Sequence, residues 1–163
     1  MEQEKFLCVM AGYDPATEAV IAARYDQVQA AGFTGTQTPD IPFHITLGTF
    51  PVSEEAYARR LVEQVAAETP AFPVAFNHLG VFQGGKVLFL APDANHQLLA
   101  LRERFGPVRG WTAHTTLLID QPAEICRALP AALEGFTAFE GRIERLWLYE
   151  FFPARYLDSQ SLR

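Results

Sequence analysis

The sequence predicts one domain, residues 1–163, that contains both helices and strands and consists of two similar lobes. The chain is long enough to bury one core, and 49% hydrophobic and 20% charged residues are ordinary values for a globular protein. Residues 44–47 and 114–117 both read His-x-Thr-Leu, and each motif is followed by a helical pattern and then by strand-like runs. This repeat suggests two lobes related by a pseudo-twofold axis, with a site in the cleft between them.

The chain is expected to begin with a strand and a helix. Residues 6–13 have the composition of a strand, and Asp14-Pro15 then favours a helix start. Apolar residues at helical spacing continue to Val28, and the helix should end before Gly32. Residues 33–42 mix Gly, Thr and Pro and are expected to form a loop.

The first motif is expected to start a strand at Phe43. A second helix should open around Ser53 and end at Pro70. Residues 72–82 and 86–90 are two strand-like runs separated by a turn that contains a Gly-Gly pair, and this pattern predicts a β-hairpin.

A third helix is expected before the second motif, and the order strand, helix, strand is expected again after His114. Residues 93–105 favour a third helix, and the second motif strand follows it. A fourth helix is expected over residues 122–133, with Pro130 as a point of disturbance. Residues 143–152 favour a closing strand, and the sequence after Pro153 is uninformative.

Each motif places an imidazole and a hydroxyl on one face of a strand. Residues i and i+2 of a strand lie about 7 Å apart on the same face, so His44 accompanies Thr46 and His114 accompanies Thr116. An imidazole titrates at a pKa of about 6.5, so two of them can act as one acid and one base. The threonine hydroxyls can donate hydrogen bonds to phosphate oxygens. The second motif is less regular, because Thr115 stands where an apolar residue would complete the alternation.

Three aromatic residues are candidate base or substrate contacts. Phe43, Phe82 and Tyr149 neighbour the motif strands or their repeat partners, and their rings could stack on a base or simply pack in the core. His78 and His96 are not expected at the site. No His-x-His or His-Glu-x-x-His spacing predicts a metal site.

Charge and composition limit the partners. The net charge of −6 and the pI near 5.2 oppose binding of long duplex nucleic acid, so a small phosphorylated ligand or an RNA end fits better. No apolar run approaches the roughly 18 residues of a membrane helix, and residues 1–5 lack a cationic signal-peptide start, which together predict a cytoplasmic protein. Cys8 and Cys126 show no Cys-x-x-Cys spacing and are expected to be buried, reduced thiols.

The two motifs are those of the 2H phosphoesterase superfamily, and the chain resembles its bacterial, 2′-5′ RNA ligase-like branch. The resemblance covers most of the chain: both motifs, residues 79–82 and 86–90, and the strand of residues 143–149. It implies a bilobal α+β fold in which two antiparallel sheets face a central cleft with helices outside. It also implies metal-independent chemistry, without a cofactor, on 2′,3′-cyclic phosphates or 2′-5′ phosphodiester bonds of RNA ends or nucleotides.

In the scheme that the resemblance implies, His44 and His114 are the catalytic acid and base, and Thr46 and Thr116 hold the phosphoryl oxygens. The sequence does not assign the acid and the base individually. Ligation, the reverse transfer, would use the same four side chains. A nucleotide- or RNA-end-binding module without turnover is the alternative outside enzymes, although binding alone needs no acid and base. A metal-binding histidine protein is a more distant alternative. A monomer is favoured.

Overall fold

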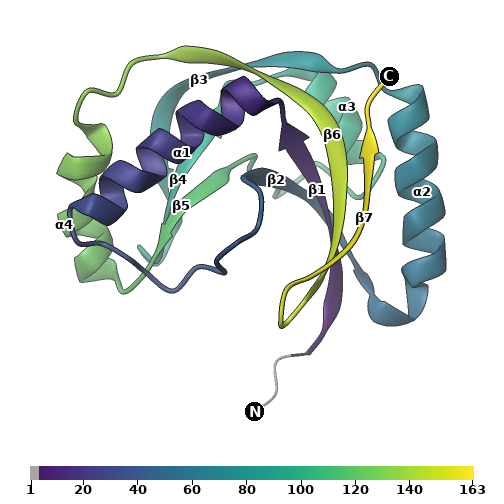
Figure 1. Cartoon of the computed structure of the whole chain (residues 1–163), viewed down its shortest axis with the longest axis horizontal. Coiled ribbons are helices and arrows are strands. Elements are labelled where there is room, and N and C mark those ends of the chain that lie inside the picture. The colour runs from purple at the N-terminus through teal and green to yellow at the C-terminus, as the bar shows by residue number, and fades with distance from the viewer. Residues whose placement is uncertain (1–3) are drawn as a thin grey trace.

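The computed structural model describes residues 4–163, so residues 1–3, part of the start that argued against a signal peptide, lie outside the described residues. The strands are β1 (Phe6–Tyr13), β2 (His44–Pro51), β3 (Phe72–Val81), β4 (Val87–Pro92), β5 (Thr115–Ile119), β6 (Phe139–Phe151) and β7 (Arg155–Ser161). The helices are α1 (Pro15–Ala30), α2 (Glu55–Glu68), α3 (His96–Glu103) and α4 (Pro122–Leu133), with a 3₁₀ turn at Val52–Glu54 before α2. Helices separate most of the strands along the chain, except within the pairs β3–β4 and β6–β7 (Figure 1).

All strand pairings in the described chain are antiparallel and join into one seven-stranded sheet, in the order β2-β1-β6-β3-β4-β5 with β7 also on β6. The long strand β6 connects two halves, because its first residues pair with β3 while the rest pairs with β1 on one side and β7 on the other. The α+β class is confirmed. The two groups of strands are linked through β6, however, and do not form two separate sheets.

The sheet curls strongly, so that β2 and β5, the first and last strands of this order, approach each other. Register shifts interrupt five of the six strand pairs, for example between Val9 and Met10 of β1 and between Leu88 and Phe89 of β4. A bulge increases local twist and bends the strand that carries it. Side chains of β2 and β5 are therefore brought together, although these strands lie at opposite ends of the strand order.

Helices cover each half of the sheet on its outer side. Figure 1 shows α2 on one flank and α1 beside α4 on the other. Ala58, Val62 and Val65 of α2 belong to the main core, which also contains Ile45 and Leu47 of the first motif strand. A second cluster packs α1 and α4 against β4 and β5. Ile45 and Leu47 are fully buried, as the strand alternation predicts.

Most predicted elements are present, and the differences have local causes. The hairpin turn between β3 and β4 has positive φ angles of 92° at Gly84 and 67° at Gly85, which glycine adopts without strain. The third helix is shorter than predicted because Asn95 caps it, accepting a hydrogen bond from the Leu98 backbone at 3.0 Å. The fourth helix runs over the predicted residues without a break at Pro130.

The predicted start of the closing strand is wrong, and a further strand lies after Pro153, where the sequence was uninformative. The closing strand starts at Phe139, four positions before the predicted residue 143, because its first part pairs with β3. A further strand, β7, follows it, so each motif strand is followed by one helix and one hairpin. Cys8 is buried as expected, but Cys126 is exposed on α4.

Candidate active site

The two motif strands are tied together by a buried hydrogen-bond relay. The Tyr13 hydroxyl lies 2.6 Å from the Thr115 hydroxyl, which donates to the His44 carbonyl at 3.0 Å. Burial raises the pKa of Tyr13, so its hydroxyl stays protonated and can donate to Thr115. Thr115 is 1% exposed, and its polar side chain, irregular in the sequence pattern, therefore fixes β5 against the backbone of β2.

Two further side chains bind the free edge of β2. Trp111 Nε1 donates to the Thr46 carbonyl at 3.0 Å, and the Arg102 guanidinium donates to the Leu47 carbonyl. The guanidinium carbon also lies 5.5 Å from the centre of the Trp111 ring. Burial lowers the pKa of Arg102. An edge strand exposes unpaired carbonyls, and here side chains from α3 and the segment after it satisfy two of them.

The two histidine rings are held in the same way. His44 Nδ1 lies 2.8 Å from the Pro42 carbonyl, and His114 Nδ1 lies 2.8 Å from the Thr112 carbonyl. A carbonyl can only accept, so each Nδ1 carries the hydrogen and each Nε2 is the nitrogen that can exchange a proton. Within residues 4–163, no hydrogen bond involves Nε2 of either ring. The repeat in sequence is thus also a repeat in ring orientation.

Both imidazoles favour the neutral form. Removal of water from the ring lowers the pKa of His44 to about 4, the hydrogen bond to Pro42 opposes this, and the nearby His114 lowers the pKa further. Burial also lowers the pKa of His114. The hydrogen bond from Thr115, the residue after His114, to the His44 carbonyl at 3.0 Å brings the two motifs together. A bound phosphodiester anion would favour protonation of one ring.

A cavity of about 510 Å³ opens beside His44. Its walls include Thr46 and Thr116, together with the loop of residues 37–43 and the apolar end of the β1–β6 pair. Figure 1 shows this loop crossing the open side of the sheet between α1 and β2. Among the described residues that line the cavity there is no lysine or arginine. The cavity is therefore suited to a compact ligand with an apolar part.

The three aromatic candidates occupy different places. Phe43 lines the cavity and packs edge-on against Tyr25, with ring centres 5.5 Å apart. Phe82 packs edge-on against His114, with ring centres 4.7 Å apart. Tyr149 lies on β6 outside the cavity wall, directly across from Cys8, which does line the cavity. The structure thus brings Phe43 and Phe82 to the histidines and places Tyr149 on a neighbouring surface.

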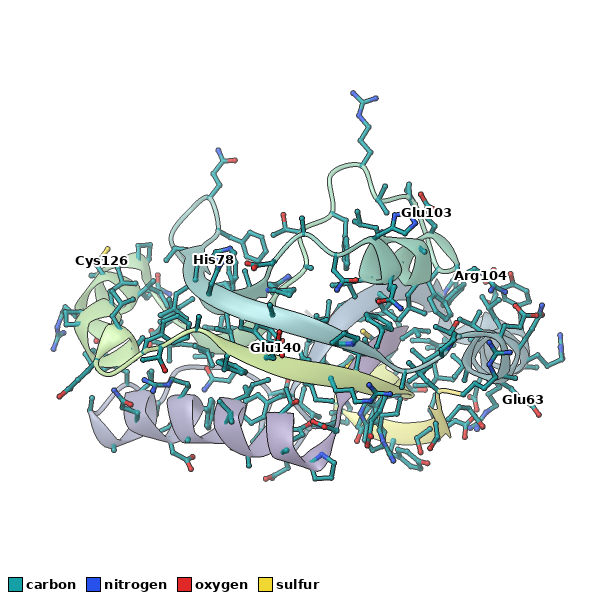
Figure 2. The ribbon with its side chains drawn as sticks, turned by 90° about the horizontal axis from the view of Figure 1, so that it is seen from above. Glu63, His78, Glu103, Arg104, Cys126 and Glu140 are labelled. Carbon is teal, nitrogen blue, oxygen red and sulfur yellow. The ribbon has the colours of Figure 1, made fainter. Side chains whose placement is uncertain are left out.

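The remaining histidines and the exposed cysteine lie away from this site. His78 is exposed on β3, beside Asn77 and Asp93, and His96 is exposed at the start of α3. Figure 2 shows His78 and Cys126 toward one end of the molecule, with Arg104 at the other. Among residues 4–163, no three His, Cys, Asp or Glu side chains are grouped as metal ligands. No helix of the described chain is long and apolar enough to cross a membrane.

Sequence reasoning missed the residues that position the motifs. Tyr13, Arg102 and Trp111 carry no motif, and each acts on β2 or β5 from a distant part of the chain. The one available signal for these contacts was Thr115, a polar residue at a position where the strand alternation calls for an apolar, inward-facing side chain. A buried threonine needs hydrogen-bond partners, so that position could have indicated a polar contact.

A comparison with protein families gives a match over most of the chain. The model of the 2′-5′ RNA ligase superfamily matches residues 15–151, a range that includes both motifs. The chain belongs to this superfamily. The resemblance inferred from the double His-x-Thr-Leu motif is therefore confirmed. No curated protein sequence matches the chain.

Solved structures of the superfamily's fold are similar over nearly the whole chain. LigT of E. coli in complex with ATP has a TM-score of 0.66 at 18% identity and covers 99% of both chains. TT0787 of Thermus thermophilus has a TM-score of 0.67 at 18% identity, covering 97% of this chain and 98% of that one. E. coli LigT in complex with 3′-AMP has a TM-score of 0.61 at 16% identity, covering 98% of this chain and 99% of that one. These similarities show a common fold.

Proposed function

We propose that this chain is a metal-independent phosphoesterase that cleaves 2′,3′-cyclic phosphate or 2′-5′ phosphodiester bonds of nucleotides or RNA ends. The observation that carries the proposal is the matched pair of histidines, each oriented through Nδ1 by the carbonyl two residues earlier. Two equivalent rings with free Nε2 atoms suit a reaction that needs one proton removed and one supplied.

The proposed mechanism uses four side chains. One neutral imidazole removes a proton from water as the water oxygen attacks phosphorus. The other imidazole, protonated, delivers its proton to the departing ribose oxygen, so the P–O bond breaks to give a free hydroxyl. Thr46 and Thr116 donate hydrogen bonds to the non-bridging oxygens as negative charge increases on them. His44 and His114 exchange roles when the opposite ester oxygen leaves.

The cavity supports a nucleotide as the substrate. It joins His44 and both threonines to an apolar region that includes Phe43, where a base can bind beside the reacting phosphate. The LigT crystals with ATP and 3′-AMP show that a protein of the same fold binds nucleotides. We further propose a monomer in the cytoplasm with a single domain over residues 1–163.

The test is a substrate screen of the purified chain in EDTA. The substrates are 2′,3′-cyclic mononucleotides, RNA with a 2′,3′-cyclic phosphate end, and 2′-5′ dinucleotides, with a 5′-hydroxyl RNA added to detect ligation. We expect hydrolysis of at least one substrate, unchanged by EDTA. Activity that EDTA abolishes and Zn²⁺ or Mg²⁺ restores would contradict the metal-independent mechanism. If the chain turned over none of these substrates, the result would contradict the proposed function.

A further inference from the structure

Three aromatic side chains form a continuous surface on the cleft side of the sheet, and we call them the aromatic stripe: Trp147 and Tyr149 of β6 and Tyr156 of β7. Trp147 lies 6.3 Å from each tyrosine, and the two tyrosines lie 5.8 Å apart, measured between ring centres. Tyr156 is 54% exposed, and the other two rings are partly exposed. Trp147 and Tyr149 also pack against the buried cluster of Cys8, Met10 and Phe151, and the parts of the three rings that stay uncovered form a surface available to a ligand.

Strand register places the stripe close to the catalytic motif. Met10 of β1 is the partner of Thr46 on one side and of Trp147 on the other, and Gly12 likewise stands between His44 and Arg145. Directly paired residues share a face of the sheet, and adjacent strands lie about 4.8 Å apart. Trp147 and Arg145 therefore lie on the face that carries the motif, about 10 Å from it across one intervening strand.

The end of the stripe nearest His44 carries a positive charge and an unpaired donor. The Arg145 guanidinium carbon lies 5.1 Å from the centre of the Trp147 ring, and no ion pair within residues 4–163 involves Arg145. Trp147 Nε1 is buried and has no hydrogen-bond partner within the described residues. A Cβ on Gly12 would collide with Trp147 and Arg145, so this glycine lets the indole lie across β1 toward the motif.

We propose that the aromatic stripe and Arg145 bind the nucleotides of a single-stranded RNA next to the phosphate held by the two histidines. Bases of any sequence stack on aromatic rings, and an arginine beside them can contact the backbone phosphate. Stacking suits a chain whose net charge is −6, because it does not require a broad basic surface. This inference rests on the proposed function and narrows it, since an RNA strand uses the stripe and a mononucleotide does not.

The test compares two substrates with the same 3′ nucleotide: a 2′,3′-cyclic mononucleotide and a single-stranded hexaribonucleotide that ends in the same cyclic phosphate. We expect the wild-type chain to have the higher kcat/KM on the hexamer. Tyr156→Ala and Trp147→Leu should each lower kcat/KM for the hexamer about tenfold, mainly through KM. Neither should change kcat/KM for the mononucleotide more than twofold. Tyr57→Ala is the matched control, because Tyr57 is 50% exposed on α2, on the outer side of the sheet.

A binding measurement separates this inference from the proposed function. Fluorescence anisotropy with a labelled hexamer that carries a 3′-phosphate should show about tenfold weaker binding to Tyr156→Ala and Trp147→Leu, and no change for Tyr57→Ala. Two results would overturn the aromatic stripe as an RNA site and leave the proposed phosphoesterase activity standing. One is that Tyr156→Ala and Trp147→Leu lose kcat/KM equally on both substrates, and the other is that neither variant changes the kinetics or the binding of the hexamer. If the wild-type chain turns over neither substrate, the proposed function fails, and the binding result alone decides whether the stripe binds RNA.

Discussion

Replacing Thr115 by valine should destabilise the fold, because the change keeps the shape of the side chain and removes the centre of the relay. The Thr115 hydroxyl connects the Tyr13 hydroxyl, at 2.6 Å, to the His44 carbonyl, at 3.0 Å. Valine can neither accept from the Tyr13 hydroxyl nor donate to the His44 carbonyl, so both of these buried groups lose their partner. Tyr13 is 3% exposed, which leaves little access for water to replace the lost bond.

The size of the effect follows from these two groups. A buried polar group left without a partner costs about 1–3 kcal/mol, and the buried methyl group of valine recovers part of that. We therefore expect Thr115→Val to lower the free energy of unfolding by about 2–4 kcal/mol. Tyr13→Phe removes the tyrosine hydroxyl alone. In the double variant no tyrosine hydroxyl is left without a partner. Its loss of unfolding free energy should therefore be at least about 1 kcal/mol smaller than the sum of the losses in the two single variants.

The assay is urea unfolding followed by tryptophan fluorescence, with the free energy obtained by linear extrapolation. Thr49→Val, at an exposed threonine on β2, is the control and should change stability by less than about 0.5 kcal/mol. In the absence of urea Thr115→Val should also reduce kcat with little change in KM, since the relay positions His44. A Thr115→Val chain as stable as the control, or a double variant with strictly additive losses, would refute the relay.

Three further predictions concern the site and one helix. The pH profile of kcat/KM should be a bell centred below pH 6.5, because burial lowers the pKa of both imidazoles, His44 to about 4, and one ring must be charged while the other is neutral. Glu18 could also shape this profile, since burial raises its pKa to about 7. Glu18→Gln is therefore the control, and a maximum of kcat/KM at or above pH 7 in both the wild-type chain and this variant would contradict the assignment to the histidines. Phe82→Ala should lower kcat about tenfold by loosening the His114 ring, and a kcat within twofold of wild type would contradict this. Pro130→Ala should stabilise α4 by about 1 kcal/mol or more in urea unfolding, and a loss of stability would be the opposite result.

The sequence was most informative where a local pattern determines structure. Alternation in residues 44–47 is enough to place Ile45 and Leu47 in the core, and the Gly-Gly pair is enough to place the hairpin turn. The second hairpin was not predicted, because β7 is an edge strand whose residues alternate irregularly. A register shift between Leu148 and Tyr149 interrupts its pairing, so its apolar residue Leu157 does not belong to a regular pattern.

Contacts between distant segments could not be predicted from one sequence. Tyr13 and Thr115 are 102 positions apart, and only the curl of the sheet brings them together. Tyr149 was predicted as a substrate contact from its strand alone. Its neighbours Trp147 and Tyr156 define a surface only once β6 and β7 are paired. Local patterns thus predicted the motif side chains of the candidate site, whereas the residues that position them required the tertiary structure.

The measurement that tests the two-histidine mechanism most directly is kcat/KM of His44→Ala, His114→Ala and the double variant on the best substrate of the screen. General acid-base catalysis contributes about 10²- to 10⁴-fold, so each single variant should lose at least about a hundredfold. Because the two imidazoles act as one unit, the double variant should lose little more than the worse single variant. Either single variant retaining a tenth of the wild-type rate, or losses that multiply fully in the double variant, would contradict the mechanism.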